Sequence, residues 1–259
     1  MENHSYDSVI GASDAPYINS LAGECALATN YHNVTHPSLP NYISATSGLD
    51  LARLDPFTGD CDPTGACTTK TESIFAQGES WKAYEESMPS NCDRSDAGNY
   101  AVRHNPPTYY TTLTGCSTND VPYSQLATDL AGNALPAFSF ITPNLVNDMH
   151  NGTVTDGDTW LSHNLPTLLD STEYRGDSTA IFLTWDEGEG GSSNDCAGNA
   201  TDVGCHVATL VISPSTAAGT RSADLFNHYS LLATAEEMLG LRKLGQAAPS
   251  ASMVSAFNL

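Results

Sequence analysis

The sequence predicts an α/β fold with a mostly parallel central sheet and helices on both faces. Three short apolar runs rich in β-branched and aromatic residues are typical of buried strands: 138–142 (FSFIT), 180–185 (AIFLTW) and 206–213 (HVATLVIS). Helical patterns lie between and after them, and strands that alternate with helices indicate a sheet covered on both sides. With 259 residues and no repeat or linker-like segment, we expect one domain over residues 1–259.

Four segments carry helical patterns. The last of them places Tyr229 and Leu232 on one face. Pro166 should limit the length of the third, because proline lacks a backbone donor. The four segments are 41–48 (NYISATSG), which follows Ser38, then 73–88 (SIFAQGESWKAYEESM), 157–171 (GDTWLSHNLPTLLDS) and 227–241 (NHYSLLATAEEMLGL).

The charge balance limits the classes of partner. Lys and Arg number 9 against 30 Asp and Glu, for a net charge of −21. This field repels polyanions, so we expect no nucleic-acid partner. An anionic substrate would need a local positive centre, either a metal ion or a histidine cluster. No apolar stretch is long enough to span a bilayer, and we expect no stable membrane insertion.

The cysteines indicate an oxidising compartment, which predicts a secreted, periplasmic or extracellular protein. There are seven, and three close pairs suggest local disulfides, with Cys25 left over. Sequence alone does not determine connectivity, and a zinc site is the alternative, although no CxxC is present. The proposed pairs are Cys61 with Cys67, Cys92 with Cys116, and Cys196 with Cys205.

Ser38 stands between two prolines in the stretch 32–44 (HNVTHPSLPNYIS). Pro37 and Pro40 stiffen the backbone around it. If a helix starts here, the Ser38 hydroxyl lies beside free N–H groups that favour an anion, and Asn41 adds a side-chain donor. A simple turn is the alternative reading.

Two acidic stretches are candidates for metal ligands. Asp186 and Glu187 follow the strand 180–185 and precede glycines; adjacent carboxylates there are costly unless a positive charge lies between them. Glu2 and Asn3 offer a carboxylate and an amide oxygen side by side. The alternatives are a solvated turn for the first pair and an exposed terminus for the second.

Several histidines complete the set of candidate residues. Asp148 and His150 in 147–152 (NDMHNG) point the same way if the segment is extended. His104, His150 and His206 together would supply the donors or positive charge that the acidic chain otherwise lacks. Any one of them, taken alone, fits a structural role better than a catalytic one, as does His228 at the head of the last helix.

Eight stretches, in this order, resemble the phosphoesterase family of bacterial acid phosphatases and phospholipases C, in the alkaline-phosphatase superfamily. The pattern is most similar to the small secreted acid phosphatases that also act on phosphoinositides, and it implies an alkaline-phosphatase-like fold. The stretches are MENHSYDSVIG, HPSLPNYISATSG, WKAYEESMP, RHNPPTYY, PNLVNDMHNGTVTDGDTWL, TWDEGEG, HVATLVISP and NHYSLLATAEEMLGL.

The resemblance implies roles for particular residues. Glu2 and Asn3 match the first two metal ligands, and Ser38 matches a nucleophile that also touches the metal. Asp186 and Glu187 match the late acidic pair, where many relatives have Asp-Asp. These oxygen ligands favour one divalent ion, Ca²⁺ first, with Mg²⁺, Mn²⁺, Zn²⁺ or iron left open. Positions expected around the phosphate or leaving group are Asn41, His104, His150 and His206.

The implied reaction is metal-dependent hydrolysis of a phosphate monoester. Ser38 attacks phosphorus to form a phosphoserine, and a protonated His150 or His206 gives its proton to the leaving group. Such an acid predicts an acidic pH optimum. The substrate would be a small phosphomonoester, or a phosphoinositide or phospholipid headgroup. A second metal site built from Asp148, His150 and His206 is a less favoured alternative.

One departure from the family concerns the first residues. In relatives an apolar strand leads into the Glu-Asn pair, whereas here the chain opens on Met1. We therefore expect either that the sequence is trimmed or that another element holds Glu2 and Asn3.

Other functions remain as alternatives. A phospholipase C or phosphodiesterase, or a phosphoinositide phosphatase, would use the same nucleophile. A sulfatase is disfavoured, because its C/S-x-P-x-R pattern needs arginine where Tyr42 stands. A calcium-dependent binding module is the non-enzymatic alternative; it rests on 54–65 (LDPFTGDCDPTG), whose Asp55, Asp60 and Asp62 lack EF-hand spacing.

Overall fold

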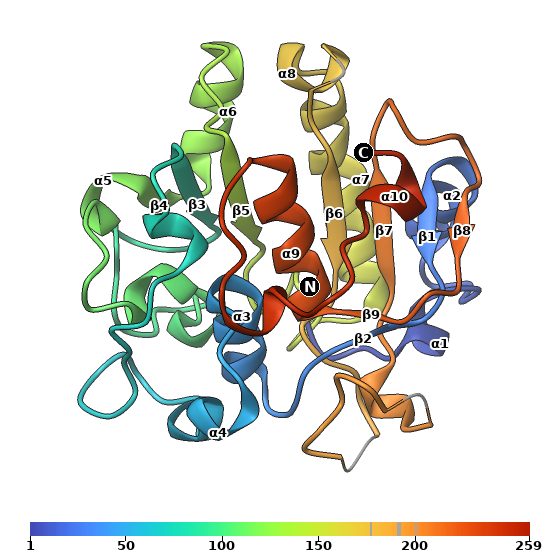
Figure 1. The fold of residues 1–259 in the computed structure, drawn as a ribbon. Coiled ribbons are helices and arrows are strands. Elements are labelled where there is room, and N and C mark those ends of the chain that lie inside the picture. The colour runs from blue at the N-terminus through green and yellow to red at the C-terminus, as the bar shows by residue number, and fades with distance from the viewer. Residues whose placement is uncertain (177, 191–192, 200) are drawn as a thin grey trace.

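The structure, a computed structural model, describes residues 1–176, 178–190, 193–199 and 201–259. It confirms the α/β class: strands run through the middle of the molecule and helices lie in front of and behind them (Figure 1). The strands form a four-stranded sheet (β6-β7-β1-β8), a three-stranded sheet (β4-β3-β5) and a two-stranded ladder (β2-β9). They are β1 (Ala26–Ala28), β2 (Tyr31–His32), β3 (Trp81–Glu85), β4 (Asp120–Pro122), β5 (Phe138–Thr142), β6 (Ile181–Thr184), β7 (Thr209–Ile212), β8 (Arg221–Ser222) and β9 (Phe226–Asn227).

The helices connect and cover these strands. The α-helices are α1 (Tyr6–Val9), α2 (Pro16–Glu24), α3 (Ser38–Ser47), α4 (Leu51–Leu54), α5 (Cys116–Asn119), α6 (Ser124–Ala131), α7 (Val154–Leu169), α8 (Thr172–Arg175), α9 (His228–Met238) and α10 (Val254–Phe257). Short 3₁₀ turns are η1 (Asp55–Phe57), η2 (Ile74–Ala76), η3 (Val102–His104), η4 (Pro106–Tyr109), η5 (Val203–Cys205) and η6 (Gly245–Ala247).

The three strands predicted from apolar runs are present as β5, β6 and β7. The direction of pairing is more mixed than expected. β3 is parallel to both β4 and β5, but β7 is antiparallel to both β6 and β1. Apolar composition predicts burial of a strand, not its direction, so this difference has no signal in the runs themselves.

The helix predicted over 73–88 is wrong. The segment forms the short turn η2 and then strand β3. Ala83 and Tyr84 are adjacent and both buried, and neighbouring side chains of a strand point to opposite faces, so apolar residues face both sides of the sheet. In such a run apolar and polar residues do not alternate, so its sequence resembles that of a helix. Gly78, with φ of 103°, separates the turn from the strand.

The other predicted helices form, with one change in length. α3 and α9 match the segments after Ser38 and near residue 227. α7 begins at a capping box, in which Asp156 N–H donates to the Thr153 hydroxyl and Thr153 N–H donates to the Asp156 carboxylate. Pro166 lies inside α7 and does not stop it, although the helix ends three residues later at Leu169.

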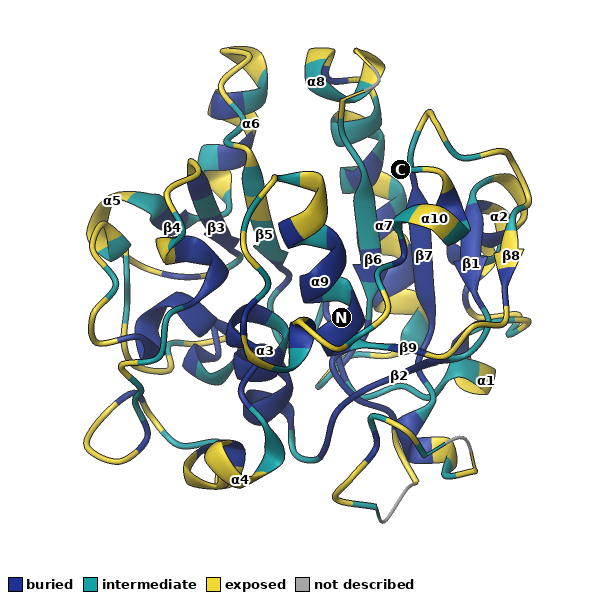
Figure 2. Cartoon of the chain, viewed as in Figure 1, coloured by how far each residue is buried: buried dark blue, intermediate teal, exposed yellow. Residues whose placement is uncertain are grey.

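Two buried clusters form most of the core. One joins β1, β6 and β7 to α2 and α7, and includes Leu27 and Val211. The other packs α3 and α9 against β3, and includes Ile43 and Leu232. In Figure 2 the strands β7 and β1 are buried throughout, whereas β5 and β6 are mostly intermediate. The expectation that all three apolar runs are buried therefore holds fully only for β7.

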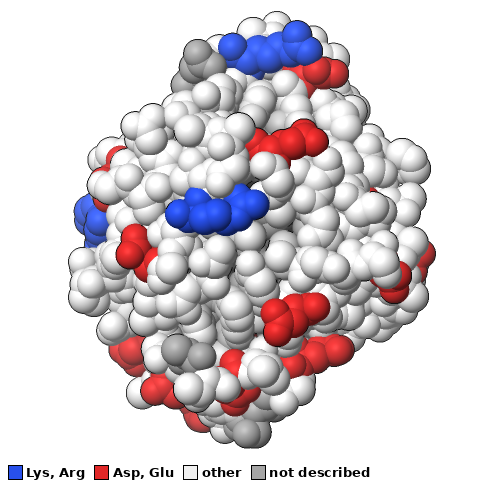
Figure 3. Space-filling view, turned by 90° about the vertical axis from the view of Figure 1, so that its right-hand side faces the viewer, with Lys and Arg blue, Asp and Glu red and all other residues white. Residues whose placement is uncertain are grey.

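The predicted disulfides are confirmed. The three bonds join Cys61 to Cys67, Cys92 to Cys116, and Cys196 to Cys205, and Cys25 is a free, half-buried thiol. Among the described residues, no helix has the length and apolar character needed to cross a membrane. On the face shown in Figure 3, acidic side chains are scattered and basic ones are isolated, without a broad basic patch.

Candidate active site

Ser38 is the first residue of α3. Pro37 precedes it in an extended conformation, and Pro40 occupies the first turn, where an N–H has no intrahelical partner to lose. The Leu39 N–H donates to the Asp60 carboxylate at 2.9 Å, which satisfies one free donor at this helix end. The two prolines thus begin a helix at the serine.

The Asn41 side chain holds the loop before Ser38. Its oxygen accepts from the N–H groups of Val34 and Thr35 at 2.9 and 3.1 Å, and its amide donates to the carbonyls of Thr35 and Pro37 at 2.8 and 3.0 Å. A primary amide offers two donors and two acceptor sites, so all four are used. In this structure Asn41 therefore has no free donor to offer a phosphate, and its role as a phosphate ligand stays a prediction.

The first residues of the chain and the segment that follows β6 meet beside Ser38. The Asp186 N–H donates to the Met1 carbonyl at 3.0 Å, and the Asn3 N–H donates to the Asp186 carboxylate at 3.3 Å, across 183 positions of sequence. Asn3 has a φ of 46°, a left-handed conformation that asparagine tolerates better than most residues. Backbone pairing and this turn place Glu2 and Asn3 beside the acidic pair.

Three side-chain oxygens converge on the Ser38 hydroxyl. Its Oγ lies 3.0 Å from Glu2 Oε2, 3.2 Å from Glu187 Oε1 and 3.5 Å from Asn3 Oδ1. Asp186 also interacts with the hydroxyl. The five residues that the sequence suggested as metal ligands thus lie together, and we refer to them as the serine cluster: Glu2, Asn3, Ser38, Asp186 and Glu187.

The serine cluster is a buried concentration of carboxylates. Burial, then the charges of Asp186 and Asp148, raise the pKa of Glu2 well above its ordinary value. Burial and then the charge of Glu187 raise the pKa of Asp186 to about 8. The buried Asp186 Oδ2 has no hydrogen-bond partner among the described groups. Hard oxygen donors, excess negative charge and an unpartnered oxygen suit a divalent cation.

His104 lies against this cluster. Its Nε2 is 3.3 Å from Glu2 Oε2 and its Nδ1 is 3.2 Å from Asp148 Oδ2. Burial lowers the pKa of His104 to about 4, against the opposing influence of Asp148. The ring also stacks on Tyr42, with 5.4 Å between ring centroids. Burial therefore favours the neutral form of His104, whose ring lies between two acids; its Nε2 and Asp148 Oδ2 have no hydrogen-bond partner among the described groups.

His150 lies next to His104. One ligand atom each from Glu2, His104 and His150 fall within 4.8 Å of one another. The Arg103 guanidinium is 3.2 Å from His150 Nε2, and because guanidinium is only a donor, this nitrogen carries no proton in the contact. The His150 N–H of the main chain donates to Asp148 at 2.7 Å.

The structure does not bring His206 into the serine cluster. Its Nε2 is 3.1 Å from the Thr29 carbonyl, and its ring stacks on Tyr6 with 4.3 Å between centroids and lies 5.6 Å from the His32 ring. The hydrogen bonds and ring contacts of His206 to described residues do not reach the serine cluster. The expected catalytic role of His206, and a second metal site that includes it, therefore lack a geometric basis.

Three residues at the site were missed by reasoning from the sequence. His36 Nδ1 bonds to Glu187 Oε2, and this bond, opposed by burial, raises the pKa of His36. The Tyr42 hydroxyl donates to Glu2 Oε1. Arg103 contacts His150. His36 and Tyr42 stand close to Ser38 in the sequence, and Arg103 precedes His104, but proximity alone does not identify a partner.

The loop considered as a calcium-binding module, residues 54–65, contacts the start of α3. Asp60 faces the start of α3 through Leu39, and a disulfide between Cys61 and Cys67 closes the loop. In the part of the chain described, Asp55, Asp60 and Asp62 do not form a shared group of metal ligands.

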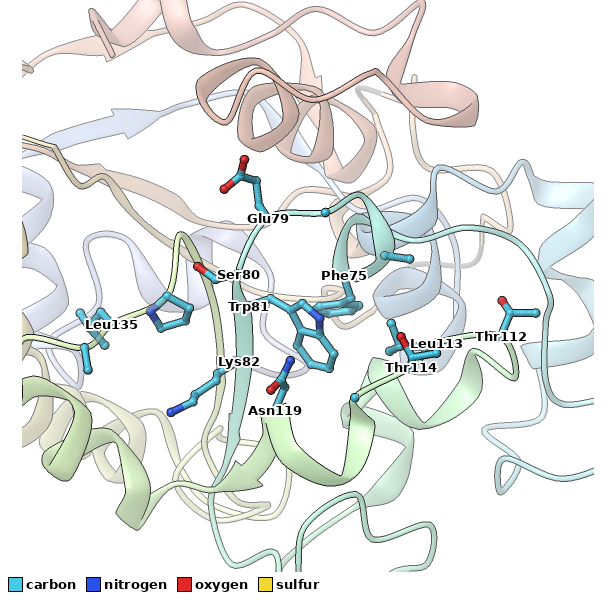
Figure 4. A pocket seen from close by; sticks show the side chains of 15 residues that line it. Phe75, Glu79, Ser80, Trp81, Lys82, Thr112, Leu113, Thr114, Asn119 and Leu135 are labelled. Carbon is cyan, nitrogen blue, oxygen red and sulfur yellow. The ribbon is translucent and has the colours of Figure 1, made fainter.

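A pocket of about 680 Å³ lies away from the serine cluster (Figure 4). Phe75 and Trp81 form its wall, and none of the predicted site residues lines it. The ammonium group of its lysine, Lys82, is 2.5 Å from the Asp129 carboxylate. This pocket therefore offers no free positive charge for an anionic substrate.

Comparison with known proteins identifies relatives over nearly the whole chain. A model of the phosphoesterase family matches residues 1–242. A phosphatidylinositol-3-phosphatase from Mycobacterium tuberculosis is 30% identical over 249 residues, which cover 95% of this chain and 77% of the relative. An acid phosphatase from Aspergillus fumigatus is 29% identical over 258 residues, covering 95% of this chain and 55% of the relative. The chain thus spans little more than half of this fungal protein.

Solved structures agree on the fold. A protein of the alkaline phosphatase superfamily from Vibrio parahaemolyticus superposes with a TM-score of 0.60 at 13% identity, covering 96% of this chain and 68% of the other. A phosphonate monoester hydrolase from Silicibacter pomeroyi superposes with a TM-score of 0.56 at 13% identity, covering 97% of this chain and 74% of the other. The alkaline-phosphatase-like fold expected from the sequence is confirmed.

Proposed function

Because the chain belongs to the phosphoesterase family, we propose that it hydrolyses phosphate monoesters with Ser38 as the nucleophile. The observation that carries the proposal is the convergence of oxygens from Glu2, Asn3 and Glu187 within 3.0–3.5 Å of the Ser38 hydroxyl. A buried serine with a purely structural role does not require several carboxylates around it. Burying these carboxylates costs folding free energy, and such a cost is typical of functional sites.

The serine cluster would hold one divalent cation through its oxygens, and the cation would offset phosphate charge and favour the Ser38 alkoxide. Of the candidate ions, Ca²⁺ is the one we favour for this set of oxygen ligands. The assay below should also be run with Mg²⁺, Mn²⁺, Zn²⁺ or iron in place of Ca²⁺. Among the protein's own groups, the Glu2 and Glu187 carboxylates are close enough to accept the Ser38 proton. Attack on phosphorus then gives a phosphoserine, which water cleaves.

The leaving group needs a proton, and we assign its delivery to His150 rather than His206. His150 shares the site with Glu2 and His104, whereas the His206 ring contacts Thr29 and Tyr6. Arg103 occupies His150 Nε2 in this structure. A phosphate oxygen attracts guanidinium strongly, so substrate draws Arg103 away and leaves the imidazole able to carry a proton. His104 keeps Glu2 and Asp148 oriented.

The substrates we propose are small phosphomonoesters, including the monoester groups of phosphoinositide headgroups. The named activities of the mycobacterial and fungal relatives support this class. Three disulfides support a secreted or periplasmic location, because such bonds persist in oxidising compartments. Phosphodiester cleavage, as in a phospholipase C, is included in the assay as the competing activity.

The test is phosphate release from a panel of phosphomonoesters, a phosphoinositide and a phosphodiester, each with and without chelator. We expect monoester hydrolysis that chelation removes and added Ca²⁺ restores. Ser38→Ala should lower turnover by at least about 10³-fold. Ser47→Ala is the matched control, because Ser47 is equally buried on the same helix but bonds to the Ile43 carbonyl and to Tyr110 instead of to the serine cluster.

Mass spectrometry of acid-quenched enzyme checks the intermediate directly. A phosphate on Ser38 is expected during turnover. Full activity of Ser38→Ala, or equal loss in both serine variants, contradicts the assignment of the nucleophile.

A further inference from the structure

One acid of the serine cluster, Glu187, bonds to a histidine that the proposed reaction does not use. Its Oε1 lies 3.2 Å from the Ser38 hydroxyl, whereas its Oε2 accepts a hydrogen bond from His36 Nδ1. The other ring nitrogen of His36, Nε2, lies 3.6 Å from Cys196 Sγ. Cys196 is bonded to Cys205, and both cysteines are completely buried. The His36 ring therefore lies between a carboxylate of the site and a disulfide.

The same disulfide lies in the loop between β6 and β7, which contacts the chain that leads from β2 into α3 (Figure 1). The Cys196 N–H donates to the Val34 carbonyl at 2.9 Å, and the Asn33 N–H donates to the Cys205 carbonyl at 3.0 Å. Both half-cystines thus bond through the backbone to adjacent residues of that chain, a few positions before the nucleophile.

The loop also bonds to the main chain beside Glu187. The Gly188 N–H donates to the Gly204 carbonyl at 3.1 Å, so the residue after Glu187 contacts the residue before Cys205. A Cβ on Gly188 would lie 2.9 Å from that carbonyl oxygen and 2.7 Å from Ser5 Oγ, so the close approach requires glycine. The side chain and the backbone of Glu187 are therefore both held by groups next to one disulfide.

We infer that His36 is a positioning residue that fixes the Glu187 carboxylate beside Ser38, and that the Cys196–Cys205 disulfide holds His36 in place for this role. A group that orients a metal ligand through a hydrogen bond typically changes metal affinity by about 10–100-fold. The effect on turnover rests on the proposed function, whereas the position of Glu187 rests on the contacts alone. Turnover would then be highest where this disulfide persists, in oxidising compartments.

The Cys92–Cys116 disulfide offers a matched control. It joins cysteines 24 positions apart, against 9 for Cys196 and Cys205, so its loss should destabilise the fold at least as much. The Cys92 N–H and Cys116 Sγ both contact Asp120, and neither cysteine contacts the serine cluster in the part of the chain that the structure describes.

The experiment measures turnover of a phosphomonoester and the Ca²⁺ concentration that gives half-maximal turnover. His36→Leu removes the donor to Glu187, whereas in His36→Asn the amide can donate from near the position of Nδ1. The unmodified full chain is compared with these two variants and with two double variants, Cys196→Ser with Cys205→Ser and Cys92→Ser with Cys116→Ser.

We expect His36→Leu to raise the half-maximal Ca²⁺ concentration by at least about tenfold, and His36→Asn to bring it back to within about threefold of the unmodified chain. Loss of the Cys196–Cys205 disulfide should raise it by a similar factor, and the control pair by less than about threefold. Added to His36→Leu, loss of Cys196–Cys205 should raise it by less than about threefold more, because the disulfide acts through His36. Equal shifts in the two double variants, or shifts that multiply, overturn the inference.

Thermal midpoints measured without Ca²⁺ test the contacts whether or not the chain hydrolyses phosphate. His36→Leu and Glu187→Gln together should lower the midpoint by at least about 2 °C less than the sum of their separate shifts, because both remove the same hydrogen bond. Additive shifts overturn the inference. Non-additive shifts in a chain that has no phosphatase activity contradict the proposed function and support the positioning of Glu187 by His36.

Discussion

Two buried acidic clusters of this molecule look alike in composition and differ in use. The serine cluster gathers Glu2, Asp186 and Glu187 around a hydroxyl. The second cluster, which we call the acid pair, consists of Glu85 at the end of β3 and Asp120 at the start of β4. In both, burial is the largest cause of a raised carboxyl pKa.

The difference lies in what surrounds the carboxylates. In the acid pair, neutral donors bond to each member: the Thr142 hydroxyl is 3.2 Å from Glu85 and the Asn105 amide is 2.9 Å from Asp120. Two such carboxyls are relieved by holding a proton. In the serine cluster, oxygens converge on one point beside a nucleophile, an arrangement that a cation relieves. Burial of acids alone therefore does not indicate a metal site.

The largest expected effect is a loss of activity and of Ca²⁺ binding when an acid of the serine cluster, but not of the acid pair, is replaced. Asp186→Asn should lower monoester turnover by at least about 100-fold and remove the stabilisation that Ca²⁺ provides. Asp120→Asn should keep activity within about threefold and keep the Ca²⁺ effect, which reaches about 2.7 kcal/mol at 100 times the dissociation constant. Calorimetric titration and thermal unfolding with and without Ca²⁺ measure this. Loss of the Ca²⁺ effect in Asp120→Asn would remove the distinction.

The next test uses the buried asparagine beside each cluster. Asn41 holds the loop before Ser38, and Asn105 bonds to Asp120 and to the Tyr100 hydroxyl. Each alanine variant should lose about 2–4 kcal/mol of unfolding free energy, at roughly 1 kcal/mol per hydrogen bond. Only Asn41→Ala should also lose activity, by about 100-fold, because the nucleophile shifts. Denaturant unfolding and turnover per folded molecule are compared; equal activity in the two variants contradicts the positioning role.

A smaller loss of turnover should show which histidine acts together with the serine cluster. His104→Gln should lower turnover by about 10–100-fold, because His104 bridges Glu2 and Asp148. His206→Gln should change it by less than about threefold, because that ring contacts Thr29 and Tyr6. Steady-state kinetics with Ca²⁺ in excess measures both. A larger loss in His206→Gln would return that histidine to the catalytic set.

The smallest effect is a pH dependence of stability. Burial raises the pKa of Asp120 to about 7 and also raises that of Glu85, so the folded state binds protons more tightly than the unfolded state. The free energy of unfolding should therefore fall as pH rises from about 4 to 7. With Ca²⁺ present throughout, Asp120→Asn should flatten this decline by roughly 1–2 kcal/mol. Denaturant midpoints across this range show it; an unchanged slope would mean that the acid pair ionises freely.

The sequence allowed prediction of much of the fold and of the list of residues at the site. The runs that became β5, β6 and β7 are apolar and β-branched, and local composition predicts such strands well. The close cysteine pairs were predictable because short loops bring them together. Glu2, Ser38 and Asp186 were candidates by residue type, but a turn or an exposed terminus remained as alternatives, and their roles came from the resemblance to the phosphoesterase family.

Other features had no local signal. β3 resembled a helix because both of its faces are buried, so apolar residues do not alternate with polar ones along it. Asn41 looked like a free donor because its four partners are backbone groups that only the folded loop brings near. His104 and His206 are alike in the sequence, and only their packing separates a bridge between two acids from a ring stacked on Tyr6.

The sequence by itself determined which chemical groups are present, where strands and helices can begin, and how strongly acidic the chain is. Only the tertiary structure decided which acids share a site, which amide is already saturated and which strands pair in parallel or antiparallel. The physical reason is the range of the interactions. Conformational preference and hydrophobicity act over a few residues, whereas hydrogen-bond saturation, desolvation and sheet pairing depend on groups that folding brings together from as far as 199 positions away.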